Sequence, residues 1–170
     1  MYQVLEKAYE QQKVVSVFIN REEPFRCNVG YIIGLNETQI ALLAIDDDKQ
    51  PEAILVFPNT DIFRVDMDGK YEDGYRIDEN LRRSIYRDFQ EICTEKDLIL
   101  RAFTYSKQQY RHMWVSFIRE DELGVVGNVM QIYGNTLKLQ RIIKNDGQDD
   151  EDGVSFICLD RVDFVACEFR

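Results

Sequence analysis

Two stretches of the chain carry the same pattern, because Gly30–Leu42 reads GYIIGLNETQIAL and Gly127–Leu139 reads GNVMQIYGNTLKL. The leading glycine and the main apolar positions coincide when the two stretches are aligned. The correspondence continues downstream, where four apolar residues of the first stretch match four of the second: Ile54, Phe57, Ile62 and Val65 match Val154, Ile157, Val162 and Val165. A sequence repeat tests each predicted strand twice. We therefore interpret the chain as duplicated, with copies near residues 3–68 and 101–168.

The spacing of apolar residues predicts the same order of elements in both copies. A helical stripe beginning at Val4 precedes strands expected at 15–19, 25–34, 39–45, 53–57 and 62–65. The second copy repeats this with a helical stripe at 99–106 and strands at 113–117, 127–132, 137–143, 154–158 and 162–167. Gly30 and Gly34 predict a bend or bulge in the second strand. A flat sheet of this size would leave open edges, so we expect each copy to curl into a small β-barrel.

The segment between the copies predicts a helical connector. Asp78 suits an N-cap, and apolar residues follow it at a four-residue step through Leu81, Ile85, Phe89 and Ile92. This spacing predicts an amphipathic helix of about four turns. Residues 94–97 fit a capping box that starts the next helix. The predicted division is therefore a first repeat at 1–72, a connector at 73–96 and a second repeat at 97–170.

Composition limits the classes of partner and the location. The 170 residues carry a net charge of −10, which disfavours binding of phosphate backbones by charge alone. No segment approaches the roughly 20 apolar residues of a membrane span, and the first residues lack the basic and apolar regions of a signal peptide. The four cysteines lack CxxC spacing, which favours reduced, buried thiols. We expect a soluble cytoplasmic protein that contacts no membrane.

The sequence contains no catalytic constellation. His112 is the single histidine, and the nucleophile-elbow, phosphate-loop and metalloprotease motifs are absent from the sequence. Carboxylates cluster in the predicted hairpins at 46–52 and 145–153. The second hairpin lacks the glycine at the sixth position of a calcium loop, so we interpret its charge as solubilising and leave a weak calcium contact as the alternative. We predict no enzyme activity, no cofactor, no metal site and no small-molecule substrate.

The glycine strand resembles a known family. Its spacing, Gly30-x-Ile32-x-x-Leu35-Asn36, resembles the first sequence motif of the Sm and Sm-like proteins, and the stretch at 127–132 preserves it. The order of one helix and five strands is also similar to that fold, a small barrel of the SH3-like type. The resemblance implies a mainly β protein with short helices, built from two tandem Sm-like barrels.

The same resemblance implies where the protein interacts. In Sm-like folds the fourth and fifth strands are short edges that pair across subunits. We therefore expect Ile54 to Phe57 and Val162 to Val165 to be the candidate interaction edges, which meet within one chain or between chains. The leading prediction is a non-enzymatic intracellular scaffold that binds a protein partner or associates with itself.

RNA binding is the alternative prediction, and it is disfavoured. RNA-binding Sm-like proteins resemble one another in a polar pair near the first turn and an Arg-Gly pair between the last two strands. Here Ile40 and Leu137 stand where a polar residue is expected, and residues 57–60 and 157–160 stand where the Arg-Gly turn is expected.

A divergent RNA-binding protein would use other groups. Two sets of residues qualify, one of polar loop residues and one in an aromatic and basic segment: Asn36, Asn59, Tyr133 and Asn135, and Tyr105, Lys107, Tyr110 and Arg111. We interpret the second set first as a helix C-terminus whose cations suit the helix dipole.

Overall fold

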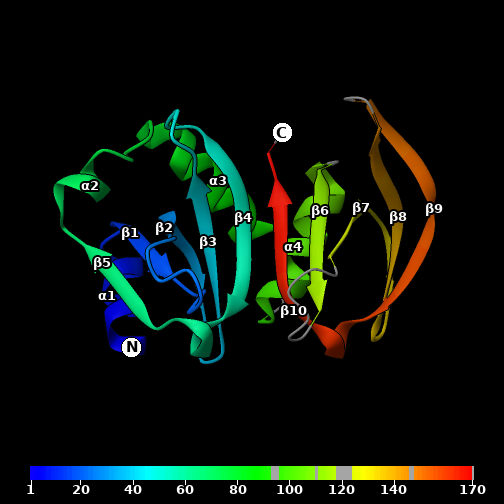
Figure 1. The fold of residues 1–170 in the computed structure, drawn as a ribbon, viewed down its shortest axis with the longest axis horizontal. Coiled ribbons are helices and arrows are strands. Elements are labelled where there is room, and N and C mark those ends of the chain that lie inside the picture. The colour runs from blue at the N-terminus through cyan, green and yellow to red at the C-terminus, as the bar shows by residue number, and fades with distance from the viewer. Residues whose placement is uncertain (93–95, 110, 118–123, 146–147, 170) are drawn as a thin grey trace.

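The computed structural model covers residues 1–170 and describes all of them except 93–95, 110, 118–123, 146–147 and 170 (Figure 1). The chain forms one antiparallel sheet of ten strands with a few short helices. We refer to the five strands within residues 14–67 as the N-terminal half of the sheet and to the five within residues 112–168 as its C-terminal half. The mainly β class predicted from the sequence is confirmed.

The N-terminal half follows the predicted order closely. Its elements are α1 (Tyr2–Glu10), β1 (Val14–Phe18), β2 (Asn28–Leu35), β3 (Gln39–Ile45), β4 (Pro51–Pro58), the 3-10 turn η1 (Asn59–Asp61) and β5 (Arg64–Met67). The predicted fifth strand began at Ile62, but η1 occupies the preceding residues and the strand begins at Arg64. The short helix α2 (Lys70–Asp73) follows β5.

The connector and the C-terminal half repeat that order. Helix α3 (Glu79–Glu91) begins after Asp78, whose side chain accepts a hydrogen bond from the backbone N–H of Leu81 at 2.9 Å, as an N-cap does. The remaining elements are α4 (Leu98–Gln109), β6 (His112–Phe117), β7 (Gly124–Tyr133), β8 (Thr136–Asn145), β9 (Gln148–Cys158), the 3-10 turn η2 (Leu159–Arg161) and β10 (Val162–Glu168).

The ten strands form a single open sheet. Their order is β5-β1-β2-β3-β4-β10-β6-β7-β8-β9, so the C-terminal half has the same internal order as the N-terminal half. The sequence predicted two tandem barrels whose edges meet within one chain or between chains, and the structure joins all ten strands into one sheet because β4 pairs with β10. Figure 1 shows β4 and β10 side by side in the middle of the molecule. The two ends of the strand order are β5 and β9.

Glycine is required where the backbones of β2 and β7 closely approach those of the adjacent strands β3 and β8. A Cβ atom at Gly30 would lie 1.9 Å from the carbonyl oxygen of Leu43, and one at Gly127 would lie 2.1 Å from that of Gln140. The register also shifts in β2 between Ile32 and Gly34, as expected for the predicted bulge, and β7 shifts at the matching place. Close backbone approach therefore explains why both halves carry this glycine.

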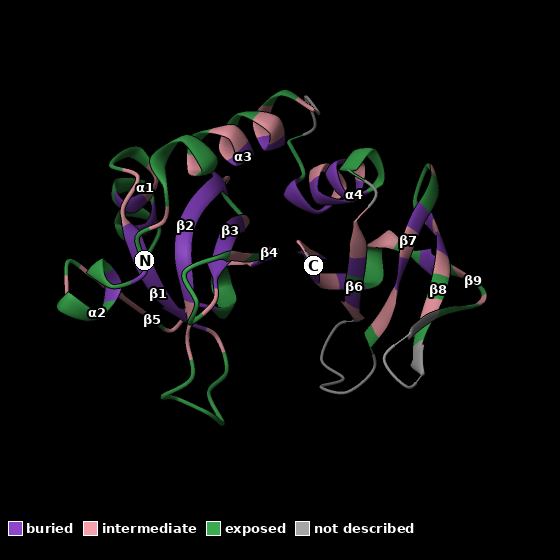
Figure 2. Ribbon diagram, turned by 90° about the horizontal axis from the view of Figure 1, so that it is seen from above, coloured by how far each residue is buried: buried purple, intermediate pink, exposed green. Residues whose placement is uncertain are grey.

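Two apolar cores lie on opposite faces of the N-terminal half. The smaller core is enclosed by α1 and the strands of that half, with Leu5, Ile40 and Phe57 among its buried members. The larger core lies on the other face and continues into the C-terminal half. It includes Phe89 of α3 and Phe103 of α4. Figure 2 shows α3 and α4 following one another along one side of the sheet, with the buried side of α4 turned toward the strands.

The helices are short. Among the described residues, none of the helices has the length and apolar character needed to cross a membrane.

We predict that Gly30→Ala destabilises the fold through steric overlap. The added Cβ forces β2 and β3 apart, and overpacking of this kind costs about 1–3 kcal/mol in the free energy of unfolding. Gly134→Ala is the comparison, because Gly134 has open space around it but a φ of +53°; adopting that φ costs a non-glycine residue about 1 kcal/mol. Chemical denaturation checks both variants, and an unchanged stability of Gly30→Ala would contradict the close approach.

Candidate functional site

The four residues predicted as interaction edges lie at the contact between the two halves of the sheet. Ile54 and Phe57 belong to β4, and Val162 and Val165 belong to β10. All four are buried. The strands pair antiparallel with Val165 opposite Val56. The structure therefore joins these two edges within one chain, which commits their backbone groups to each other and not to an outside partner.

Apolar side chains cover both faces of the β4–β10 contact, which we call the internal junction. On one face the ring of Phe57 stacks on Phe164 with centroids 5.9 Å apart, and Trp114 meets Phe164 edge-on at 5.4 Å. On the other face α4 packs against β7 and β10 of its own half and against β3 and β4 of the N-terminal half. A Cβ at Gly34 would lie 3.1 Å from Leu98 of α4, so the glycine leaves room for this helix.

The strands at the two ends of the sheet differ in character. β5 is short and carries Arg64 and Asp66, which form an ion pair along the strand. β9 is the longest strand described, and the part of it that follows Gly153 exposes Val154 and Phe156. Its preceding part is acidic, and Asp152 there pairs with Arg141 of β8 at 3.1 Å. The outward apolar residues of β9 are the largest apolar exposure on a strand that ends the sheet.

Asn36, predicted as a candidate RNA contact, is held by the turn between β2 and β3. Its Oδ1 accepts hydrogen bonds from the backbone N–H groups of Thr38 at 2.9 Å and Gln39 at 2.7 Å. Its Nδ2 donates to the carbonyl oxygen of Lys96 at 2.8 Å. This Asx-type arrangement stabilises the turn and attaches it to the segment before α4. The amide is therefore occupied in the fold.

The other polar loop candidates make similar contacts. Asn59 Nδ2 donates to the carbonyl oxygen of Glu37 at 3.0 Å, and Asn135 Nδ2 donates to Asp160 at 2.6 Å. Each bond ties a β-turn to the 3-10 turn of the same half. Tyr133, the aromatic residue of this set, lies at the end of β7 and is exposed to solvent.

The aromatic and basic segment is not an exposed stacking surface. Tyr105 is buried, with its ring 5.8 Å from that of Phe89, so the prediction that it is available to stack a base is wrong. Its position on the buried side of α4 explains this, since that helix packs between the halves. The guanidinium of Arg111 lies over the ring of Phe169 at 4.2 Å. Lys107 is exposed, and Tyr110 lies outside the described residues.

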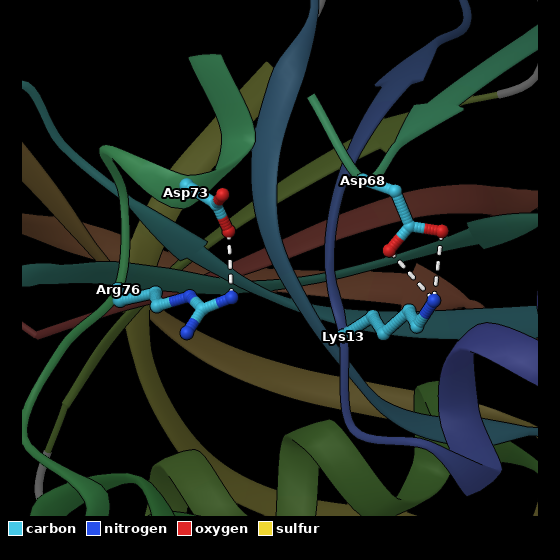
Figure 3. A network of polar contacts seen from close by, with 4 residues as sticks. All are labelled: Lys13, Asp68, Asp73 and Arg76. Carbon is cyan, nitrogen blue, oxygen red and sulfur yellow. Dashed lines mark hydrogen bonds and ion pairs between the residues drawn. The ribbon is translucent and has the colours of Figure 1, made fainter. Parts of the chain in front are cut away.

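A polar cleft of about 490 Å³ lies where β1, β5, α2 and α3 meet. Lys13 Nζ donates to both carboxylate oxygens of Asp68 at 2.6 and 2.7 Å, and Arg76 pairs with Asp73 at 2.6 Å (Figure 3). Glu72, which lines the cleft and is buried, accepts a hydrogen bond from the hydroxyl of Ser16 at 2.6 Å. Sequence reasoning missed this cleft, because its charged residues look like ordinary surface residues until β5 pairs with β1.

The ion pairs and hydrogen bonds of the cleft hold β5 against β1. Lys13 precedes β1 and Asp68 follows β5, while Ser16 and Glu72 join β1 to α2. Asp68 has a φ of +63°, a left-handed conformation that persists where the surrounding contacts hold it. The network therefore fixes the terminal strand of the N-terminal half in place.

Cysteines and carboxylates do not gather into a metal site in the part of the chain that the structure describes. The predicted acidic hairpin lies partly outside that part, at residues 146–147. Cys167 is buried in β10, Cys27 is half-buried and Cys158 is exposed, which corrects the expectation of buried thiols for Cys158; Cys93 lies outside the described residues. Burial raises the pKa of Cys167 to about 12.

Comparisons of the chain with protein-family models, with curated proteins and with solved structures find no match.

We predict that Cys167 reports opening of the internal junction. Its raised pKa keeps it a thiol at pH 8, and the thiolate is the reactive form. Iodoacetamide should therefore modify Cys158 in the native protein and leave Cys167 unmodified until denaturant separates β4 from β10. Peptide mass spectrometry measures both sites in one sample. Modification of Cys167 at the rate of Cys158 under native conditions would contradict a closed junction.

Proposed function

We propose that this protein is a non-enzymatic scaffold, built from two duplicated Sm-like barrels, that binds protein through the edge strands of its sheet. The observation that carries the proposal is the position of β5 and β9 at the ends of the strand order, with Val154 and Phe156 exposed on β9. The internal junction already uses β4 and β10, so the interaction edges move from the residues predicted by sequence to the two terminal strands.

The matching halves support the duplicated-barrel part of the proposal. Both halves place their strands in the same order, and both have a glycine under a crossing carbonyl and a register shift two residues later. A fold kept in two copies while polar turn residues diverge is typical of a binding framework, since a shared catalytic site would need shared polar groups. Asn36 against Tyr133 is one such divergence.

An edge strand binds by adding another strand to the sheet. Its outward backbone N–H and C=O groups provide the affinity, and alternate side chains provide specificity. Natural proteins protect long edges with charge to prevent indiscriminate pairing. On β9 the acidic residues Asp150 to Asp152 protect the first part of the strand, so the apolar part from Val154 to Cys158 is the part that we assign to binding.

An enzymatic or RNA-binding function has less support from the contacts of the polar residues. The described cations of the polar cleft are paired with its carboxylates, and the predicted loop amides are bonded within their own turns. A ligand would have to displace these bonds before it gained any of its own. RNA binding therefore remains the less favoured alternative.

We predict that Phe156→Lys removes protein capture. Phe156 is 67% exposed, so the substitution leaves the core intact while adding a charge to the edge. The tagged protein, incubated with extract of its native cell, should retain partners that Phe156→Lys retains at least fivefold less. Phe25→Lys is the matched control, because Phe25 is 91% exposed in the loop before β2. Nuclease treatment should change nothing; equal capture by all three proteins, or release by nuclease, would refute the proposal.

We further predict that the purified protein does not shift a pool of cellular RNA in electrophoresis at about 50 mM salt. Phosphate contacts strengthen as salt falls, so this condition favours detection. A shift that Tyr133→Ala abolishes would establish the RNA-binding alternative in place of the scaffold.

A further inference from the structure

Apolar side chains gather on one face of the C-terminal half, apart from its edge. Helix α4 packs against the other face of this half, where Val129, Leu137 and Leu139 are buried. We call the side of β6–β9 that points away from α4 the outer face. Six apolar residues stand on it, each exposed or half-buried: Trp114, Val126, Met130, Ile142, Val154 and Phe156. Exposed apolar patches on this scale mark interaction sites.

The strand registers match the outer face to a buried face of the N-terminal half. Val154 of β9 pairs with Gln140 as Ile54 of β4 pairs with Leu43. The shared glycine motif and these registers give three apolar pairs: Met130 with Ile33, Val154 with Ile54, and Phe156 with Val56. The residues of the N-terminal half are fully buried in all three pairs, whereas Met130 is 41% and Phe156 67% exposed.

Helices cover the matched face in the N-terminal half. Gln90 of α3 donates a hydrogen bond to the carbonyl oxygen of Ile33, and the guanidinium of Arg82 lies over the ring of Tyr31 at 5.1 Å. Phe89 of α3 is buried in the core to which this face belongs. The chain itself therefore shows which element covers such a face: an amphipathic helix that adds polar contacts to its apolar ones.

The dimensions of the outer face fit one helix. Three strand spacings of about 4.8 Å separate β6 from β9, which makes the face about 14 Å wide. A helix with its side chains is about 10–12 Å across. A strand cannot bind here, because β7 and β8 already pair with a neighbour on each side.

The charge on the outer face adds a requirement for the occupant. Lys138 stands on this face between Gln131 and Phe156 in the register, is half-buried, and takes the place of the buried Ala41. Among the described residues, Lys138 forms no ion pair. An acidic side chain on the occupant would pair with it in a partly desolvated place, where such a pair is stronger than in open water.

We propose that the outer face binds an amphipathic helix of a protein partner, with an acidic side chain of that helix opposite Lys138. This inference goes beyond the proposed function, since the site is a sheet face and not a strand edge. Polar residues at the centre of the face, among them Asn128 and Gln140, keep it compatible with water when no helix is bound. The association is therefore reversible.

Photo-crosslinking tests the proposal with the full chain. The crosslinking residue p-benzoylphenylalanine replaces Trp114, Met130 or Val154 in three separate proteins. Each protein is irradiated in extract of its native cell, and mass spectrometry locates the crosslinked residues. The three sites should react with one segment of one partner, at residues three, four or seven apart, because residues at these spacings share a helix face.

Two variants and a control establish that the face itself is bound. Met130→Lys and Lys138→Glu should each reduce the crosslinking from the Trp114 site at least fivefold. Leu81→Lys is the matched control, because Leu81 of α3 is also 41% exposed but lies outside the outer face, and it should change nothing. Circular dichroism of each variant verifies that the fold is retained.

Three results would overturn the proposal. Crosslinked residues two apart would indicate a bound strand, and crosslinks to the sequence of this chain would indicate a second copy in place of a partner. Crosslinking that stays equal in Met130→Lys and Leu81→Lys would show that the outer face is not the site. In each case, capture of proteins that Phe156→Lys loses and Met130→Lys retains leaves the proposed scaffold function standing.

Discussion

The pairing of β4 with β10 is the contact on which the rest of the structure depends. Each half of the sheet would otherwise end in a strand with open backbone groups, and open edges invite uncontrolled pairing. Joining the two edges within one chain satisfies those groups. It also places α4 between the halves, so that the larger apolar core extends from β2 through β4 into the C-terminal strands. The two halves therefore share the larger of the two cores.

The same pairing determines where the molecule can interact. Because β4 and β10 pair with each other, the remaining backbone edges of the sheet belong to β9 and β5, the strands at its two ends. The contacts of the polar cleft fix the position of β5. The Lys13–Asp68 and Ser16–Glu72 hydrogen bonds hold β5 and α2 against β1. A strand fixed in this way keeps its outward edge in the geometry that a partner strand needs.

Local structure followed from the sequence, whereas long-range pairing followed only in part. The bounds of β3, the Asp78 cap of α3 and the bulge at Gly34 were all predicted, since each depends on residues near it in the chain. The pairing of β4 with β10 within the chain was one of two arrangements predicted for these edges. An apolar strand pattern does not by itself identify the neighbouring strand, so the sequence left the choice open. The prediction that the loop amides contact RNA has a related weakness. A polar side chain in a turn is a candidate ligand group until its intramolecular partners are known, and Asn36 proves to bond to the carbonyl oxygen of Lys96.

Differences between the matched halves carry more information than their likeness. Gly34 lies beneath Leu98, and its counterpart Gln131 is exposed; Leu43 is buried, and its counterpart Gln140 is half-buried. Polar residues therefore stand at these two places in the C-terminal half, whereas Met130, the counterpart of the buried Ile33, stays apolar and is 41% exposed. Phe156 also stays large and apolar, and it lies on the strand that ends the sheet with 67% of its surface exposed. Solubility alone does not explain a phenylalanine there, whereas a strand partner does.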